Sequence, residues 1–315
     1  MNPQGSEGAN ALDVGFIGVG FIGVGNMGWP MAANLVNGGF DVAVADARRE
    51  VANNFVQQLG GTAPDTLAQL AASSGVVVTM LPTSAHVATV LADGADNVLA
   101  GLKPGSIVID MTSGQPAVTQ ALAARVAAAG SVLIDAPVSG GVSRARTGEL
   151  AIMVGGPAEA IARARPVLAA MGATITRCGE VGAGQAMKAL NNLVSAGGFL
   201  IGIEALLIGQ KFGLDAGLMT DVLNASTGMN NSTQKKFRQF VLSRGFDSGF
   251  SLELMVKDLS IALEMARGGA VPAPFAAQCR ELWAAAAAML GPGQDHTALA
   301  KLPEALAGME LKAQE

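Results

Sequence analysis

Two short segments carry the residues whose types and spacing could do chemistry. One is the glycine-rich run G-V-G-N-M-G at residues 23–28, and the other is K-A-L-N-N, in which Lys188 and Asn192 are one helical turn apart. A glycine-rich turn ahead of a helix lets backbone N–H groups approach a dinucleotide pyrophosphate. A lysine among apolar neighbours has a lowered pKa and can exchange a proton near neutral pH. The pair indicates hydride transfer assisted by a lysine.

The pattern G-x-G-x-x-G occurs in two overlapping registers, because G-F-I-G-V is repeated in tandem over residues 15–24. Only the later register is followed directly by a helical pattern, with Pro30 in its first turn. We therefore expect the first copy to extend a strand or to precede it. The expected cofactor-binding residues of the turn are Gly23, Val24, Gly25, Asn26, Met27 and Gly28.

An acidic residue follows the next predicted strand, D-V-A-V-A at residues 41–45. Asp46 lies about twenty residues beyond the turn, where a carboxylate binds the adenosine ribose hydroxyls and repels a 2′-phosphate. This favours NAD as the cofactor. Arg48 and Arg49 come next and could accommodate that phosphate, which leaves NADP open.

The patterns that position these residues divide the chain in two. Strand-like runs alternate with helical stretches in the first half, at 19–22, 41–45, 76–81, 106–109, 132–134 and 151–154. This alternation predicts a mostly parallel, doubly wound Rossmann-type sheet. Beyond residue 175 only helical patterns remain, at 184–212, 216–224, 232–242, 251–266, 274–290 and 298–306. We expect a nucleotide-binding domain at 13–178 and an all-helical domain at 179–315.

Composition excludes several classes of function. The net charge is −5 and there is no basic block, so nucleic-acid binding is not expected. The apolar run at residues 14–24 is too short to span a membrane. Two cysteines without a C-x-x-C pair favour a reducing, cytoplasmic location and no metal site. The absence of tyrosine excludes a Tyr-x-x-x-Lys catalytic motif.

Three further segments make a family resemblance specific. D-A-P-V-S-G-G at 135–141, G-A-G-Q-A-M-K-A-L-N-N at 182–192 and K-D-L at 257–259 occur in this order. Together with G-V-G-N-M-G-W-P-M-A they resemble the β-hydroxyacid dehydrogenase family, which includes enzymes of the 3-hydroxyisobutyrate dehydrogenase and tartronate semialdehyde reductase types. The resemblance extends from about residue 14 to 306. It implies a 6-phosphogluconate dehydrogenase-like fold, a Rossmann domain followed by an all-α domain.

The resemblance also implies roles for individual residues. Lys188 matches the catalytic general acid/base, and Asn192 matches a substrate-binding asparagine. Ser139, Gly140 and Gly141 match the loop that holds the substrate carboxylate. On the cofactor side, the matching residues are Leu81, Pro82, His86, Ser113 (where the family more often has threonine) and Lys257. Asp258 either orients Lys257 or caps locally.

Residues at which this chain differs from related families limit the reactions that we expect of it. Ser195 stands where 6-phosphogluconate dehydrogenases carry a glutamate, which disfavours oxidative decarboxylation. Lys188 argues against imine reductases, which usually replace it. Met229, Asn230 and Asn231 lie in a polar segment that we expect to line the far side of the substrate pocket, which suggests a substrate with extra hydroxyl or carbonyl groups.

The sequence thus predicts an NAD(P)-dependent oxidoreductase that interconverts a small 3-hydroxy acid and its semialdehyde, of the 3-hydroxyisobutyrate or 2-hydroxy-3-oxopropionate type. A glyoxylate or succinic semialdehyde reductase and a non-catalytic dinucleotide-binding protein are the alternatives. The expected partner molecule is a small carboxylate-bearing substrate. The long apolar helix after Gly184 should pack against a second subunit, giving a homodimer or homotetramer.

Overall fold

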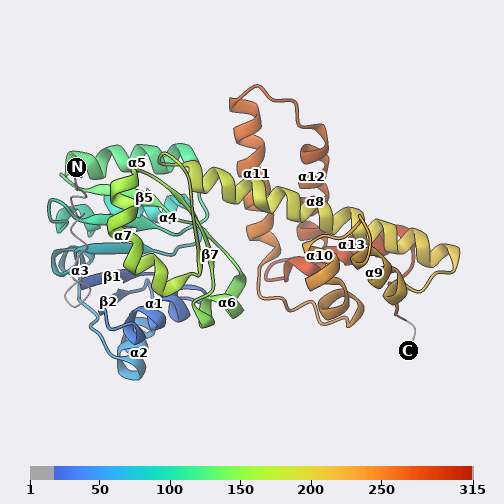
Figure 1. Cartoon of the computed structure of the whole chain (residues 1–315), viewed down its shortest axis with the longest axis horizontal. Coiled ribbons are helices and arrows are strands. Elements are labelled where there is room, and N and C mark those ends of the chain that lie inside the picture. The colour runs from blue at the N-terminus through green and yellow to red at the C-terminus, as the bar shows by residue number, and fades with distance from the viewer. Residues whose placement is uncertain (1–17, 314–315) are drawn as a thin grey trace, which may run out of the picture. The chain divides into compact units, whose positions relative to one another are not determined.

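The computed structural model describes residues 18–313, which form two compact units. The N-terminal unit runs to Met187 and the C-terminal unit begins at Lys188 (Figure 1). This division lies inside one continuous helix, α8 (Ala183–Phe212). The boundary expected from the sequence, 178/179, lies nine residues before this division, at the last residues of the final strand, β8 (Thr174–Gly179).

An eight-stranded sheet forms the centre of the N-terminal unit, in the order β2-β1-β3-β4-β5-β7-β6, with β8 paired to β7. Strands β1 to β5 pair in parallel, whereas β7 is antiparallel to β5 and β6 and parallel to β8. This confirms the predicted Rossmann-type sheet. The remaining strands are β1 (Gly18–Ile22), β2 (Asp41–Ala45), β3 (Val76–Thr79), β4 (Ile107–Asp110), β5 (Val132–Asp135), β6 (Val138–Ser139) and β7 (Ala151–Gly155).

Helices cover both faces of this sheet because its strands are apolar on both sides. In β4, Ile107 and Ile109 join one core and Val108 joins the other. The first face is covered by α1 (Gly28–Asn37), α2 (Arg49–Leu59), α6 (Gly141–Thr147) and α7 (Ala158–Met171). The second is covered by α3 (Leu67–Ser73), α4 (Ser84–Ala88), the π-helical turn η2 (Thr89–Asp93), the 3₁₀ turn η3 (Val98–Ala100) and α5 (Pro116–Ala128).

Two strands were not expected from the sequence. The pattern of β8, T-I-T-R-C-G, is polar and half-exposed along its length, so it lacks the apolar run of a buried strand. It forms because β7 offers a free parallel edge. The two-residue strand β6 is too short for any periodicity and depends on its antiparallel pairing with β7.

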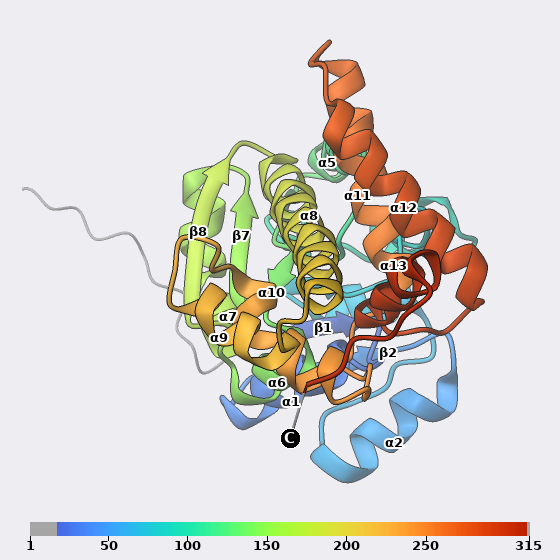
Figure 2. The same cartoon turned by 90° about the vertical axis from the view of Figure 1, so that its right-hand side faces the viewer.

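In its described residues the C-terminal unit consists of helices joined by loops, with an isolated β-bridge between Ser251 and Asp295. Buried side chains of α8, among them Phe199 and Ile203, pack with Trp283 and Phe237 into one core. Helices α11 and α12 lie side by side (Figure 2). The elements after α8 are α9 (Ala216–Asn224), α10 (Asn231–Lys235), the π-helical segment η4 (Phe237–Leu242), α11 (Leu252–Gly268), α12 (Pro274–Leu290), the 3₁₀ turn η5 (His296–Ala300) and α13 (Lys301–Ala307).

The helix expected at 232–242 is a correction to the sequence analysis. It is interrupted at Lys236, whose backbone leaves the helical region with φ −130° and ψ −41°, and it continues as η4. The Phe237 ring approaches α8 closely at Gly202, where an added Cβ would lie 2.5 Å from the ring. Tertiary packing therefore decides the course of the chain here.

Among the described residues, α8 is the helix that meets the length and apolarity of a membrane span, with a mean hydropathy of 1.7 in its most apolar window. In that window 56% of the residues are buried inside the protein. Core helices of soluble proteins have the same composition, so this is weak support for a membrane span.

Candidate active site

The glycine turn after β1 fits a dinucleotide pyrophosphate. Gly23 has φ +97°, and an added Cβ would lie 2.3 Å from the Met80 carbonyl oxygen. At Gly28 an added Cβ would lie 1.8 Å from the Gly23 carbonyl oxygen, so the start of α1 packs directly on the turn. At Gly25 nothing lies within 4 Å of an added Cβ. The turn is thus tight, closely packed and open at the one position where a phosphate must approach.

Backbone donors at this turn belong to the first turn of α1. The N-cap residue, Met27, supplies no side-chain cap. The first N–H groups of a helix have no intrahelical partner and form its positive end. Asn26 is exposed beside them. Residues 23–28 can therefore hold the diphosphate of NAD(P), which supports the sequence prediction for the later glycine register.

Asp46 lies directly after β2, half-buried, where its Oδ1 accepts the backbone N–H of Arg48 at 3.0 Å. The Arg48 side chain is largely exposed and lies 3.7 Å from the same oxygen. Arg49 donates instead to the carbonyls of Ala63 and Pro64 and pairs with Asp65. Arg49 is thus engaged elsewhere, and Asp46 with Arg48 remains at the position predicted for the adenosine ribose.

The other predicted cofactor residues of the N-terminal unit follow β3 and β4. The Leu81 backbone N–H donates to Thr112 Oγ1 at 3.0 Å, which ties the two loops together. Thr83 Oγ1 lies 2.7 Å from His86 Nδ1, so the His86 ring is held at the start of α4. Pro82 and His86 are exposed and Ser113 is half-buried. The carboxyl edge of the parallel sheet, where dinucleotides bind in this fold, thus carries all four predicted residues: Leu81, Pro82, His86 and Ser113.

The predicted carboxylate loop joins β6 to α6. Ser139 ends β6, and Gly140 and Gly141 follow with φ of +136° and +66°. An added Cβ at Gly141 would meet nothing within 4 Å, whereas one at Gly140 would lie 2.8 Å from the Arg144 side chain. The loop leaves its backbone accessible at Gly141, as an anion-binding loop requires.

A buried polar network that the sequence analysis missed holds the start of α8. The Asp135 carboxylate accepts the backbone N–H groups of Gly182 at 2.7 Å and Gln185 at 2.8 Å. The Gln185 amide donates to the Thr112 carbonyl and accepts the Gly114 N–H, both at 2.7 Å. Burial raises the pKa of Asp135. This network fixes the first turn of the helix that carries Lys188, and the D-A-P and G-A-G-Q segments are its sequence signal.

In the C-terminal unit, Lys188 is buried, with 8% of its surface exposed. Burial lowers its pKa, the nearby Asp258 carboxylate partly opposes this, and the Lys257 ammonium lowers it further. A buried lysine of this kind loses its proton more readily than an exposed one. Lys188 therefore has the electrostatic setting of a general acid/base.

The predicted residues around Lys188 form a connected cluster. Asn192 is buried, and its Nδ2 donates to Asp258 Oδ2 at 2.6 Å. Asp258 Oδ1 lies 3.4 Å from Lys257 Nζ, which favours the orienting role for this aspartate over a local cap. Asn191 donates to Asn192 Oδ1 at 3.1 Å. The structure thus groups Lys188, Asn192, Lys257 and Asp258 on α8 and α11.

The polar segment at 226–236 is partly structural. The Asn230 side chain accepts the backbone N–H groups of Ser232 and Thr233 and so caps α10. Its amide oxygen is therefore committed to the helix start, and its Nδ2 donates to the Gly198 carbonyl of α8. Met229 is half-exposed, and its sulfur accepts from Gln234. These contacts explain part of the segment's polarity without a substrate.

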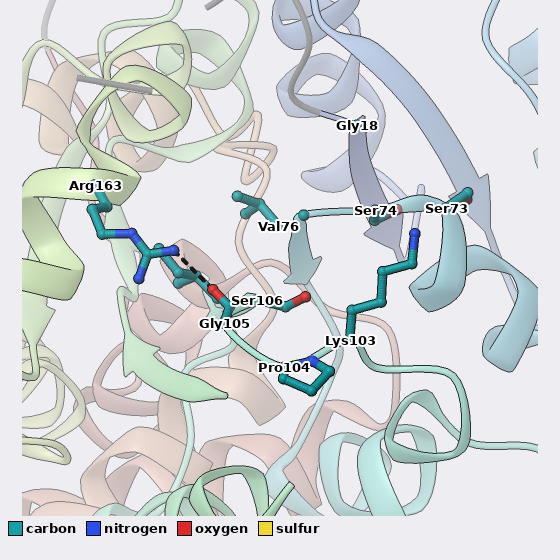
Figure 3. Close-up of a pocket in the computed structure, with 11 residues that line it drawn as sticks. Gly18, Ser73, Ser74, Val76, Lys103, Pro104, Gly105, Ser106 and Arg163 are labelled. Carbon is teal, nitrogen blue, oxygen red and sulfur yellow. Dashed lines mark hydrogen bonds between the residues drawn. The ribbon is translucent and has the colours of Figure 1, made fainter. Parts of the chain in front are cut away.

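The pocket shown in Figure 3 is lined by none of the candidate site residues, and its volume is about 390 Å³. Gly18, Val76 and Ile107, which begin β1, β3 and β4, line it together with Lys103 and Arg163. It therefore lies at the amino edge of the sheet, opposite the glycine turn. The cofactor cannot reach the carboxyl edge from there, so this pocket is not the candidate active site.

Comparison with known proteins supports the same interpretation. Residues 18–179 match the NAD binding domain of 6-phosphogluconate dehydrogenase, and residues 182–303 match the NAD-binding domain of NADP-dependent 3-hydroxyisobutyrate dehydrogenase. The 2-(hydroxymethyl)glutarate dehydrogenase of Eubacterium barkeri is 36% identical, over 96% of this chain and 98% of its own. The chain belongs to the β-hydroxyacid dehydrogenase family.

Two further members of this family are similar over most of their length. The 3-hydroxyisobutyrate dehydrogenase of Pseudomonas aeruginosa is 39% identical, over 86% of this chain and 91% of its own. A solved structure of Mycobacterium tuberculosis 3-hydroxyisobutyrate dehydrogenase with L-serine is 32% identical, with a TM-score of 0.83 over 92% of this chain and 99% of that one. As a β-hydroxyacid dehydrogenase, the protein is an NAD(P)-dependent oxidoreductase that acts on a CH–OH group. This confirms the predicted family, enzyme class and cofactor type.

Proposed function

We propose that this β-hydroxyacid dehydrogenase interconverts a small 3-hydroxy acid and its semialdehyde, with Lys188 as the general acid/base. The burial of Lys188, with its lowered pKa, is the observation that carries the proposal. The relatives named for 3-hydroxyisobutyrate and 2-(hydroxymethyl)glutarate support the substrate class, since both compounds contain a HOCH₂–CH–COO⁻ group.

NAD(P) supplies the hydride acceptor in oxidation and the hydride donor in reduction. Lys188 accepts or donates the proton that accompanies this hydride transfer. In oxidation its neutral amine takes the hydroxyl proton while the hydrogen on the same carbon leaves as hydride. The electron pair of the former O–H bond then completes the carbonyl group. In reduction its ammonium returns that proton to the oxygen. Both steps need a lysine that titrates closer to neutrality than an exposed one.

Other residues of this chain would hold the substrate. Asn192 lies one helical turn after Lys188 on α8, on the same face. Its amide is oriented by the hydrogen bond to Asp258. The accessible backbone at Gly141, with the Ser139 hydroxyl, offers donors to the substrate carboxylate. Lys257, held beside Asp258, adds positive charge near Lys188.

The direct test is turnover of a panel of 3-hydroxy acids with NAD⁺ and NADP⁺, and of their semialdehydes, glyoxylate and succinic semialdehyde with the reduced cofactors. We expect Lys188→Ala to lower kcat by about 10²–10⁴-fold. Lys235→Ala, at an exposed lysine of the same unit, is the matched control. Retained turnover in Lys188→Ala would refute the proton-transfer role. Absence of NADH or NADPH binding in a fluorescence titration would contradict the dehydrogenase function itself.

We also propose that the protein forms a homodimer through α8. Val194, Ile201 and Ile208 recur every seven residues on this helix and are 76%, 54% and 72% exposed. Phe212 at its end is 85% exposed. An apolar stripe with this spacing suits packing against a second helix.

Sedimentation of purified protein tests the dimer. Ile201→Glu should yield a monomer, because it places a charge in the stripe. Lys235→Glu, at an exposed position of α10, should leave the assembly unchanged. A monomeric wild-type protein would contradict the proposal.

A cytoplasmic location is the remaining proposal. Its support is that Cys178 and Cys279 are both free thiols, as in proteins of reducing compartments. Fractionation of cells that produce the protein is the test. Recovery in a membrane or extracellular fraction would contradict it.

A further inference from the structure

A second lysine of the C-terminal unit lies near Lys188 and has no role in the proton step. Lys236 occupies the break between α10 and η4. Its Nζ lies 3.2 Å from Ser195 Oγ and 5.8 Å from the centroid of the Phe199 ring. The break in the helix therefore directs this ammonium onto α8.

The contacts of Lys236 fall on the face of α8 that carries the predicted catalytic residues. Lys188, Asn192, Ser195 and Phe199 follow one another at intervals of four, three and four residues, which places them on one helical face. Ser195 is about two turns, roughly 10 Å of helix rise, beyond Lys188. The Lys188 charge is close enough to lower the pKa of Lys236. The Lys236 ammonium therefore lies by the same face of α8 as Lys188, about two helical turns farther along the helix.

The charge of Lys236 is not neutralised by an ion pair. None of the ion pairs in the described part of the chain includes it. The carboxylate that raises its pKa is that of Asp295, which already accepts from the Ser248 hydroxyl and the backbone N–H groups of Gly249 and Thr297. Its hydrogen-bond acceptor, Ser195 Oγ, is neutral.

A half-buried cation of this kind costs folding free energy. Burial and the Lys188 charge lower the pKa of Lys236 to about 8, and Asp295 only partly opposes them. The group is nevertheless mostly protonated at pH 7. A methionine side chain could fill the same space without this cost. The ammonium group of Lys236 therefore points to an anionic ligand.

We propose that Lys236 and Ser195 form a subsite that binds a second carboxylate of the substrate, on the substituent farthest from the hydroxyl-bearing carbon. The inference rests on the proposed function and specifies its substrate class. The preferred substrates are 3-hydroxy acids whose side chain ends in a carboxylate. A short alkyl substituent leaves the Lys236 ammonium without a partner, whereas a chain that continues along α8 brings its terminal anion to it.

Two substrates isolate this contact. 3-Hydroxyisobutyrate and 2-(hydroxymethyl)glutarate share the HOCH₂–CH–COO⁻ group and differ in the third substituent, a methyl group in the first and CH₂CH₂COO⁻ in the second. Both present the same reacting carbon and the same first carboxylate. A difference between them therefore reports on the far end of the substrate alone.

The experiment compares kcat/KM for both substrates in wild type, Lys236→Met, Lys236→Arg and the neighbouring control Lys235→Met. We expect Lys236→Met to lower kcat/KM for the dicarboxylate by about 30-fold or more, mainly through KM, because a desolvated charge contact is lost. The monocarboxylate should change by less than about threefold. Lys236→Arg should keep most of the preference, and Lys235→Met should behave as wild type. Equal losses on both substrates would overturn the subsite.

A binding experiment separates this inference from the proposed function. Glutarate, which lacks the hydroxyl and cannot be oxidised at that carbon, is titrated against the NADH-bound protein while thermal unfolding is followed. Stabilisation of wild type and of Lys235→Met, but not of Lys236→Met, supports the subsite even if no hydroxy acid is turned over. No stabilisation of wild type, or equal stabilisation of all three proteins, would overturn it.

Discussion

Asn192 and Asp258 form a buried hydrogen bond, 2.6 Å from Nδ2 to Oδ2, that joins α8 to α11. The same carboxylate raises the pKa of Lys188 against the effect of burial. The residue predicted to bind substrate and the residue predicted to move the proton are therefore connected through one aspartate. Asp258 positions Asn192 through the hydrogen bond and acts on Lys188 through its charge.

The first prediction concerns the pH dependence of oxidation. Asp258→Asn removes a negative charge, so the pKa of Lys188 should fall further. Oxidation needs the neutral amine, and its rate therefore rises as pH increases through that pKa. We expect the acid limb of the kcat/KM profile to move to lower pH in Asp258→Asn. Asp247→Asn, on an exposed loop, should leave the profile in place. A shift to higher pH would contradict the assignment.

The second prediction separates the roles of two glycines. Gly25→Val introduces a side chain into open space, so the free energy of unfolding should change by no more than about 0.5 kcal/mol while NADH binding is lost. Gly28→Ala forces a Cβ against the Gly23 carbonyl and should destabilise the protein by about 1–3 kcal/mol or more. Denaturant unfolding and fluorescence titration measure the two effects. Normal cofactor affinity in Gly25→Val would place the pyrophosphate elsewhere.

The third prediction concerns the choice of nicotinamide cofactor. Asp46 repels a 2′-phosphate, and Arg49 is engaged with Ala63, Pro64 and Asp65. We expect wild type to favour NAD⁺, and Asp46→Ser to raise the NADP⁺ to NAD⁺ ratio of kcat/KM by about tenfold, which corresponds to about 1.4 kcal/mol. Asp41→Ser, at the other end of β2, is the control. An unchanged ratio in Asp46→Ser would remove Asp46 from the ribose site.

The fourth prediction is a stability effect of Lys236. Its pKa falls from 10.5 in the unfolded chain to about 8 in the folded protein, chiefly because of burial. Below pH 8 both states are protonated and the folded state carries the full cost, about 3 kcal/mol. Between pH 8 and 10.5 the unfolded state binds more protons, so the stability of wild type rises with pH.

Denaturant unfolding of wild type and Lys236→Met across this range measures the effect. Lys236→Met should be the more stable protein at pH 7, and its advantage should shrink as pH approaches 10.5. An advantage that stays constant with pH would show that the ammonium carries no such cost. Lys235→Met again serves as the exposed control.

Much of the architecture, and the elements that carry several candidate site residues, were predictable because their signals are local. The strand at 41–45 and the helices at 216–224 and 274–290 have the predicted bounds, since apolar periodicity and proline or capping residues define them within a few positions. The glycine turn was assigned to the later register for the same reason, a helix that follows it at once.

Other features depend on residues far apart in the sequence, and only the tertiary structure decided them. The strand β8 exists through pairing with β7, the helix breaks at Lys236 where the next ring packs on Gly202, and Ser195 meets a lysine 41 positions away. Asn230 is engaged as a helix cap. Local sequence patterns fix which elements form, but the partner of a buried charge depends on which surfaces pack together, and that is a property of the whole chain.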